Sequence, residues 1–235
     1  MLKSNFFRWK KYFLGFIVMA TFTSCKVAYF PTTHNSPMLS NKGEFQASGI
    51  IGAGNLELQT AYAVTDNIGV MLNGSYFSDK REISLDEDIT KDITEQRTLI
   101  EAGAGYFTKI GGSVILEVYG GGGIGKVPGD FRYVDYTYDG SQTASMSKIF
   151  LQPAIGLGSD LADFSGVFRV SLITINNETR YFVEPGLLMK VGYKNVRFVG
   201  NLGFSASYYA NKTFSWDHNP FIIGLGLQFN IGRKY

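Results

Sequence analysis

Two groups of side chains in this chain have the types needed for acid–base hydrolysis. Asp86, Glu87 and Asp88 form an acidic run, and Asp217 directly precedes His218. A carboxylate beside an imidazole can take a proton from water and so activate it for attack. Both groups fall between stretches that we expect to be strands, where charged pairs arise by chance. A hydrolase that uses these loop residues is therefore an alternative hypothesis, and we expect that the protein is not an enzyme.

Cofactor, metal and nucleic-acid chemistry finds no support in the sequence. The run Gly120–Gly123 is not followed by Lys-Ser or Lys-Thr or by a helical pattern, so it is not a phosphate loop. His and Cys residues show no metal-ligand spacing, so no metal site and no cofactor are expected. Without the four basic residues of the first 24 positions, the net charge falls from +2 to −2, which does not favour a nucleic-acid partner.

Cys25 is the single cysteine, and its position behind an export signal gives it a specific meaning. Met1–Lys11 is basic, and Tyr12–Phe22 is an apolar stretch of 11 residues, too short to cross a bilayer, which needs roughly 20. The following Phe22-Thr23-Ser24-Cys25 resembles the cleavage motif of lipoprotein signal peptides, although Leu is usual where Phe22 stands. The resemblance implies a signal peptide over 1–24 and a diacyl or triacyl (palmitate-type) anchor on Cys25. Two or more acyl chains hold a protein stably at a membrane. An ordinary signal peptide followed by a chance cysteine is the alternative.

Residues 25–43 are expected to form the lipidated N-terminus and an extended tether. Lys26–Lys42 contains Pro31, Pro37 and many small polar residues, without strand alternation. His34 lies in this stretch, where we expect a solvated loop residue. Acidic residues, which the surface-export tags of Bacteroidota lipoproteins carry after the cysteine, are missing here. The resemblance therefore implies a lipid on the periplasmic side.

Strict alternation of apolar and small or polar residues begins after Gly43 and defines the third region, 44–235. In the last stretch, one face carries Phe221, Ile223, Leu225, Leu227, Phe229 and Ile231, and the other carries Ile222, Gly224, Gly226, Gln228 and Asn230. Successive side chains of a strand point to opposite faces. The apolar face of a membrane barrel turns out to lipid and the polar face lines the lumen. Charged residues make up 18% of the chain against a usual ~25%, which favours membrane strands over a soluble enzyme.

Ten such stretches follow one another, with about the length that membrane strands need. Short turns alternate with longer connections, among them the polar loops Asp79–Glu95 and Lys126–Ser145, as expected for periplasmic turns and outside loops. The sequence thus predicts an all-β fold, an antiparallel up-and-down transmembrane β-barrel of ten strands. Eight strands is the alternative if the first two form one bent ribbon, and a soluble lipid-tethered barrel is another. The expected strands are Glu44–Ala53, Leu56–Thr65, Ile68–Ser78, Gln96–Thr108, Ser113–Gly125, Met146–Gly158, Ser165–Ile175, Tyr181–Gly192, Val196–Tyr209 and Asn219–Ile231.

Several of these features together resemble one group of proteins. The entry Lys42-Gly43-Glu44, the stretch Ala61–Gly69 and the Gly-aromatic last strand look like uncharacterised outer-membrane β-barrel lipoproteins of Bacteroidota. The resemblance implies an outer-membrane location in a Gram-negative envelope, with an anchor at the N-terminus. Phe229 and Tyr235 also resemble the C-terminal signal that the barrel-assembly machinery reads, which would be a partner during biogenesis.

Strand parity predicts which charged side chains point into the lumen. Four acids and four bases share the inward face, and they should form ion pairs because an unpaired buried charge is costly. We therefore expect a mostly filled lumen and a structural or partner-binding role in the envelope, with a narrow channel for small solutes as the alternative. Replacing Glu117 by Ala should destabilise the barrel. The lumen ion-pair candidates are Glu57, Arg97, Glu101, Glu117, Arg169, Glu184, Lys190 and Arg197.

Overall fold

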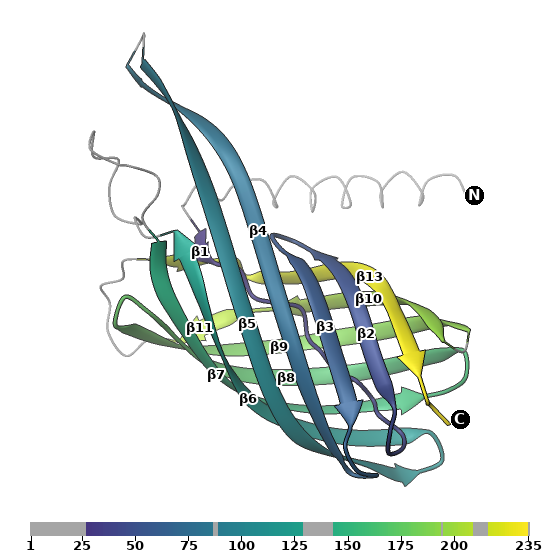
Figure 1. Ribbon diagram of the computed structural model, residues 1–235. Helices are drawn as coiled ribbons and strands as arrows, with labels where there is room; N and C mark the ends of the chain where they lie inside the picture. The colour runs from purple at the N-terminus through teal and green to yellow at the C-terminus, as the bar shows by residue number, and fades with distance from the viewer. Residues whose placement is uncertain (1–26, 87–88, 129–142, 194, 209–215, 235) are drawn as a thin grey trace, which may run out of the picture.

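The computed structural model describes residues 27–86, 89–128, 143–193, 195–208 and 216–234 (Figure 1). Side chains are described for these residues except those of 79–94. Cys25, the signal peptide and most of the predicted loop Lys126–Ser145 lie outside the described residues. Among the described residues, no helix is long and apolar enough to cross a membrane.

One antiparallel sheet closes on itself to form the barrel. The last strand pairs with the first barrel strand through Leu225 and Ile51, and with its other neighbour through Leu225 and Gly200. A short strand, β11 (Ala206–Tyr208), continues β10 after an interruption at Ser205. The prediction of ten antiparallel strands is therefore confirmed. The barrel strands are β2 (Phe45–Gly52), β3 (Leu56–Ala63), β4 (Ile68–Asp86), β5 (Ile89–Gly111), β6 (Val114–Pro128), β7 (Thr143–Gly158), β8 (Ala162–Ile175), β9 (Glu178–Tyr193), β10 (Val196–Phe204) and β13 (Phe221–Ile231).

The two ends of the barrel differ. One end, here called the short-turn mouth, carries the turns around Asp66, Ser159 and Asn195 and the last described residues, 232–234. The other end, the long-loop mouth, carries the β4–β5 hairpin, the strand ends on either side of 129–142, and the two-residue strand β12 (Asp217–His218). This asymmetry is the one that outer-membrane barrels show between periplasmic turns and outer loops.

The segment Asp79–Glu95, predicted as a polar loop, is instead a continuation of two strands. β4 and β5 stay paired from Ile68 and Tyr106 up to Asp86 and Ile89, and their hairpin rises well beyond the other strands (Figure 1). The loop prediction is wrong because an antiparallel ladder uses backbone groups whatever the side-chain polarity. The segment is also rich in Ile and Thr, which favour strands.

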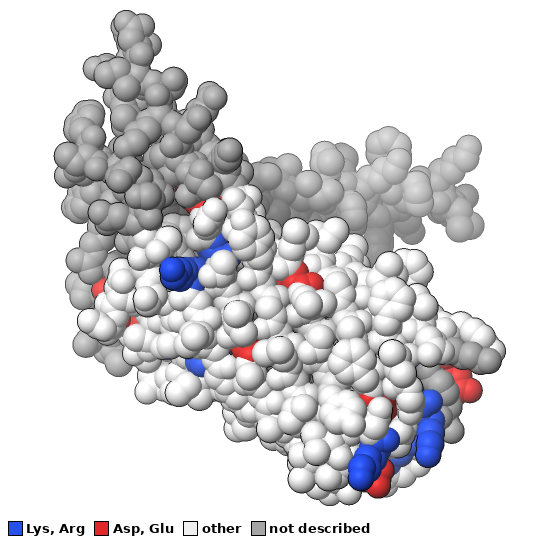
Figure 2. Space-filling view, in the orientation of Figure 1, with Lys and Arg blue, Asp and Glu red and all other residues white. Residues whose placement is uncertain are grey.

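The outward face of the wall is apolar, as the alternation predicts. Phe198, Leu225 and Ile51 point outward and are 72%, 69% and 69% exposed, whereas Gln228 on the inward face is 2% exposed. Figure 2 shows that the side wall between its two ends is largely uncharged, with a few acidic atoms visible, and that basic side chains gather at both ends. An apolar outer wall around a polar interior is the arrangement of outer-membrane barrels.

The N-terminal segment 27–41, here called the core segment, lies inside the barrel. It begins with β1 (Val27–Tyr29), which pairs in parallel with β12, and runs along the lumen to the start of β2 (Figure 1). Residues 28–39 other than Phe30 are buried, and His34 is only 1% exposed. The expectation of a solvated His34 is therefore wrong, and the stretch expected to be an extended tether is buried over most of its described length. The composition of small polar residues and proline fits a narrow polar lumen as well as it fits water.

Candidate functional site

The candidate site is the lumen itself, where the inward side chains of the wall contact the core segment along its length. At the long-loop mouth, Ala28 and Tyr29 pack in an apolar cluster with Phe182 and Trp216. The rings of Tyr29 and Phe182 lie 5.1 Å apart. The backbone N–H of Asn219 donates to the Tyr29 carbonyl at 2.9 Å. Apolar packing and a backbone bond together hold this end of the segment.

Arg97 reinforces the same end of the segment. Its guanidinium donates to the Val27 carbonyl at 3.3 Å and lies 3.9 Å from the centre of the Phe30 ring. The Phe77 ring is 4.1 Å away on the wall. A cation over two aromatic faces is attracted by both, so Arg97 joins the wall to the segment.

An ion pair in the wall organises the middle of the lumen. Arg169 donates to the Glu184 carboxylate at 2.6 Å. The same Glu184 accepts from the Tyr29 hydroxyl at 3.2 Å, and Arg169 also donates to the Thr32 carbonyl at 2.7 Å. A buried pair is favourable only when its remaining hydrogen-bonding capacity is satisfied. Here the core segment supplies two of those partners.

Two further carboxylates bind the segment through its threonines. Glu57 accepts from the Thr33 backbone N–H at 3.0 Å and from the Thr33 hydroxyl. Glu101 accepts from the Thr32 hydroxyl at 3.1 Å and forms an ion pair with Lys148 at 2.7 Å. Wall carboxylates thus take the place of water for polar groups of the segment.

His34 sits between two strands of the wall. Its Nε2 donates to the Glu184 carbonyl at 2.9 Å, and its own carbonyl accepts from the Asn201 side chain at 3.0 Å. The ring lies where the wall has Gly186 and Gly203 in place of side chains. A histidine in this position is a packed and hydrogen-bonded part of the interior.

The second half of the segment is held in the same manner. Glu117 accepts from the Met38 backbone N–H at 2.9 Å and from the Ser36 hydroxyl at 2.5 Å. Lys190 donates to the Pro37 carbonyl at 3.1 Å, and Gln152 donates to the Asn35 carbonyl at 2.8 Å. Backbone groups of an extended, non-pairing segment need such partners when they are buried.

At the short-turn mouth the segment leaves the lumen and enters β2. The Ser40 backbone N–H donates to Glu44 at 2.8 Å, and that of Lys42 donates to Asp66 at 2.9 Å. The Asn41 side chain donates to the Gly232 carbonyl at 2.9 Å. The end of the segment is therefore tied both to a turn and to the C-terminal residues.

Glycines of the wall mark where the bulkier residues of the segment lie. A Cβ added at Gly54 would overlap the Phe30 ring, and one at Gly186 would overlap the His34 ring. At Gly156 it would come within 2.6 Å of the Met38 methyl, and at Gly69 within 2.8 Å of Leu39. The lumen-facing glycines that thin the wall thus leave room for side chains of the segment.

The eight charged residues predicted to point inward are all buried, with between 0% and 8% of their surface exposed. Arg169 and Glu184 pair with each other. The other contacts differ from the expected mutual pairing, because Glu101 pairs with Lys148 and Arg197 with Asp163 at 2.6 Å. The remaining members of the set, Glu57, Arg97, Glu117 and Lys190, hydrogen-bond the core segment.

The sequence reasoning missed the burial of the segment and of several charged wall residues, among them Lys148, Asp163 and Arg180. Lys148 shares strand parity with Gln152 and could have been assigned to the lumen by that signal. Asp163 was placed in the turn Ser159–Phe164, although it pairs with Arg197 and accepts from Arg233 at 2.6 Å. The segment has no periodicity, so no pattern in it indicated burial.

The loop residues considered for hydrolysis are positioned only in part. Residues 87–88 and the side chain of Asp86 lie outside the described residues. His218 lies against the Phe182 ring at 5.1 Å and bonds through Nε2 to the Ser205 carbonyl at 3.2 Å. Burial lowers the pKa of His218, so its imidazole is neutral at pH 7. Within the described residues, no group of three or more His, Cys, Asp or Glu side chains could hold a metal ion.

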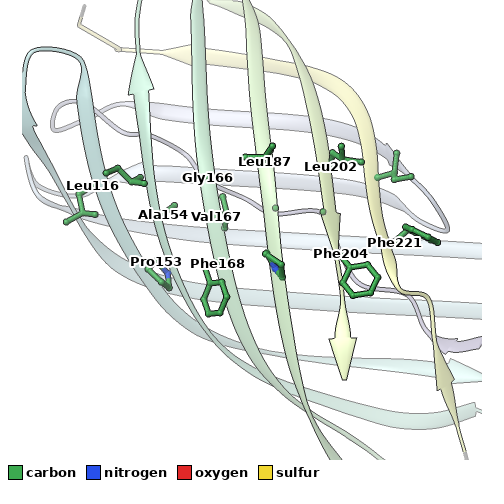
Figure 3. Close-up of a pocket in the computed structure, with 15 residues that line it drawn as sticks. Leu116, Pro153, Ala154, Gly166, Val167, Phe168, Leu187, Leu202, Phe204 and Phe221 are labelled. Atoms are coloured by element: carbon green, nitrogen blue, oxygen red, sulfur yellow. The ribbon is translucent and has the colours of Figure 1, made fainter. Parts of the chain in front are cut away.

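The outer wall carries a shallow apolar groove of about 1030 Å³ across β6 to β13 (Figure 3). Phe168, Leu187 and Phe204 line it. Pairing between β7 and β8 is interrupted here, because Leu151 faces Val170 and the next pair is Ala154 with Val167. Pro153 falls in this gap, as a residue without an N–H donor should. The groove belongs to the apolar outer surface.

Comparisons with known proteins give distant structural similarity and no family. No protein-family model matches the chain, and no curated protein matches it. A solved structure of OmpT, an outer membrane protein of Vibrio cholerae, is 13% identical with a TM-score of 0.36; the match covers 75% of this chain and 55% of that one. The N-terminal β-barrel domain of OprF from Pseudomonas aeruginosa is 14% identical with a TM-score of 0.31, covering 82% and 98%. The fold assignment rests on this chain's own strand pairing.

Proposed function

We propose that this protein is an outer-membrane β-barrel lipoprotein whose lumen is closed by its own core segment, with a structural or partner-binding role in the cell envelope. The observation that carries the proposal is the row of wall contacts from Val27 to Lys42. Glu184, Glu57 and Glu117 each accept hydrogen bonds from this segment. An apolar outer wall supports the membrane location.

A closed lumen follows from the cost of opening it. Moving the segment out would leave Glu57 and Glu117 without their backbone donors, and unsatisfied buried charged groups are costly. A narrow solute channel, the alternative function, would have to run alongside the segment or displace it. We therefore expect a barrel that does not conduct.

The partner-binding part of the proposal is supported by the long hairpin. The pairing of β3 with β4 reaches Tyr76, and that of β5 with β6 reaches Thr98. Beyond these residues, β4 and β5 pair with each other up to Asp86. Exposed strand edges can accept a strand from another protein. The hairpin is the part of the described chain best suited to reach an envelope partner above the membrane.

The anchor and the biogenesis route are part of the same proposal. Lipidation of Cys25 would hold the N-terminus at the membrane, and the aromatic residues Phe229 and Tyr235 near the C-terminus would be read by the barrel-assembly machinery. Both extend the resemblance to Bacteroidota barrel lipoproteins. Incorporation of labelled palmitate into the wild type, and its loss in Cys25→Ala, tests the anchor.

Conductance of the purified protein in a planar bilayer tests the closed lumen. The folded wild type should give no steady current steps. Heat-modifiable migration in gels, unboiled against boiled, would show in the same sample that the barrel is folded and resistant to detergent. A folded wild type that conducts steadily contradicts the closed lumen and favours the channel.

A further inference from the structure

The direction of the core segment has a consequence for where the N-terminus lies. Val27 pairs with Asp217 at the long-loop mouth, and Lys42 bonds to Asp66 at the short-turn mouth. The segment therefore crosses the full length of the lumen. Its 15 residues can span up to about 50 Å when extended, more than the ~30 Å hydrocarbon core.

We propose that the barrel threads its own N-terminal segment outward, so that the chain upstream of Val27 begins on the cell exterior. Short turns of outer-membrane barrels face the periplasm and long loops face outside. Lys26 is bonded to Val27, so whatever precedes the core segment starts at the long-loop mouth. The lumen thus acts as a conduit that presents the N-terminus at the cell surface.

The side of the lipid follows, and this step rests on the proposed lipidation of Cys25. One residue, Lys26, lies between Cys25 and Val27, so the two are at most about 7 Å apart along the chain. Acyl chains attached there would enter the outer leaflet beside the long-loop mouth. The sequence led us to expect a periplasmic lipid, because acidic residues are missing after Cys25. The direction of the core segment favours the opposite side.

The wall contacts are specific to this direction of threading. An apolar cluster of Tyr29 with Phe182 and Trp216 stands at one end, and backbone bonds to Glu44 and Asp66 stand at the other. Between them, the glycines of the wall match individual side chains of the segment. A segment of the opposite direction, with Val27 at the short-turn mouth, would not meet these partners in order.

An engineered disulfide tests whether the segment is threaded. A Cβ at Gly224 would lie 3.6 Å from the Thr33 Cβ, within the range of about 3.5–4.5 Å for disulfides. The double variant Thr33→Cys with Gly224→Cys should cross-link in the outer membrane and change its non-reduced gel mobility. The matched control pairs Thr33→Cys with Asn230→Cys, an inward position about 20 Å further along β13. The single variants report any competing bond to Cys25. No cross-link in the first pair, or equal cross-linking in both, overturns the threading.

Labelling of intact cells with a membrane-impermeant maleimide tests the side. Val27→Cys and Lys42→Cys are the matched pair, and Asn177→Cys, in the exposed β8–β9 turn, reports the orientation of the barrel. Each signal is divided by labelling of the folded protein in detergent. Val27→Cys and Asn177→Cys should react on intact cells, and Lys42→Cys only after the outer membrane is opened. If Val27→Cys does not react even in detergent, the test rests on two other results. The engineered disulfide shows whether the segment is threaded, and Asn177→Cys shows which mouth faces outside.

The outcomes distinguish the surface presentation of the N-terminus from the proposed lipidation of Cys25, on which only the lipid step rests. Protection of Val27→Cys on intact cells while Asn177→Cys reacts overturns the surface presentation, whether or not Cys25 takes up palmitate. Reaction of Lys42→Cys with protection of Asn177→Cys on intact cells would show that the barrel has the opposite orientation, and this also overturns the surface presentation. Surface reaction at Val27→Cys without palmitate on Cys25 keeps the threading and removes the anchor.

Discussion

On β13, Leu225 points outward and is 69% exposed, whereas its neighbour Gly224 points inward and lies against Thr33 of the core segment. The outer position needs only an apolar side chain, because lipid tails place no particular demand on its shape. The inner position needs a glycine, because a Cβ there would crowd the Thr33 methyl. The two faces of one strand thus differ in how closely each residue is specified. The outward face needs only to suit lipid tails, whereas the inward face needs to fit the side chains of the core segment.

The largest effect should come from the inner face, at Glu184. Glu184→Ala removes the partner of Arg169 at 2.6 Å and the acceptor for Tyr29 at 3.2 Å. Breaking a buried ion pair on one side leaves a buried charge uncompensated and costs about 3–5 kcal/mol. Urea unfolding in phospholipid vesicles should show this loss in the free energy of unfolding. Lys109→Ala, at an exposed position of the short-turn mouth, should stay within about 0.5 kcal/mol. Equal effects in the two variants would contradict a tightly specified inner face.

On the outer face, the cost of a charged substitution should depend on its depth in the membrane. Leu225→Arg places a cation in the middle of the outer wall and should reduce the free energy of unfolding by about 2–4 kcal/mol, whereas Ile231→Arg on the same face at the strand end should cost about 0–1 kcal/mol. The vesicle assay used for Glu184→Ala measures both. If neither change matters, the outer wall faces water, and the alternative of a soluble, lipid-tethered barrel is favoured.

Much of the outer face could be predicted from the sequence, because outward apolar residues alternate with inward small or polar residues along the strands. Parity also placed Arg169 and Glu184 on the same inward face, and they form an ion pair. Parity says which way a side chain points but not what it meets. Glu57 illustrates this, since its partner is a backbone N–H of Thr33, a group that every residue type except proline offers.

The burial of the core segment could not be predicted from the sequence for a related reason. Small polar residues such as Thr32 and Ser36 suit water and a polar lumen equally, so their types do not distinguish an exposed tether from a buried segment. His34 is polar too, yet it is buried with its ring bonded to the Glu184 carbonyl. The length of the β4–β5 hairpin was not predicted either. The many charged residues of Asp79–Glu95 indicated a loop, although the backbone there is paired as two strands.

Glu117 offers a smaller test of the inner face, with a built-in comparison. Glu117→Ala leaves the Ser36 hydroxyl and the Met38 N–H without their acceptor, and an unsatisfied buried donor costs about 1–3 kcal/mol. Glu117→Gln keeps a carbonyl acceptor and should lose less of the free energy of unfolding in the same urea titration. If the two variants lose the same amount, the carboxylate stabilises the barrel through its charge rather than through these hydrogen bonds.

The finest comparison concerns the fit between a single glycine and a single side chain. Gly186→Ala would push its new methyl into the His34 ring, and overpacking of this kind costs about 1–3 kcal/mol. Gly166→Ala on the neighbouring strand has nothing within 4 Å of the added Cβ and should be close to neutral. Both losses are measured as changes in the free energy of unfolding.

His34→Ala alone should cost about 1–3 kcal/mol, since it leaves the buried Glu184 carbonyl without its donor. Combined with Gly186→Ala it should remove the clash, so the double variant should be more stable than the sum of the two single losses implies. Contacting residues show such coupling, whereas distant ones add. Simple additivity would mean that His34 does not lie against Gly186, and the inner face would then be no more closely specified than the outer one.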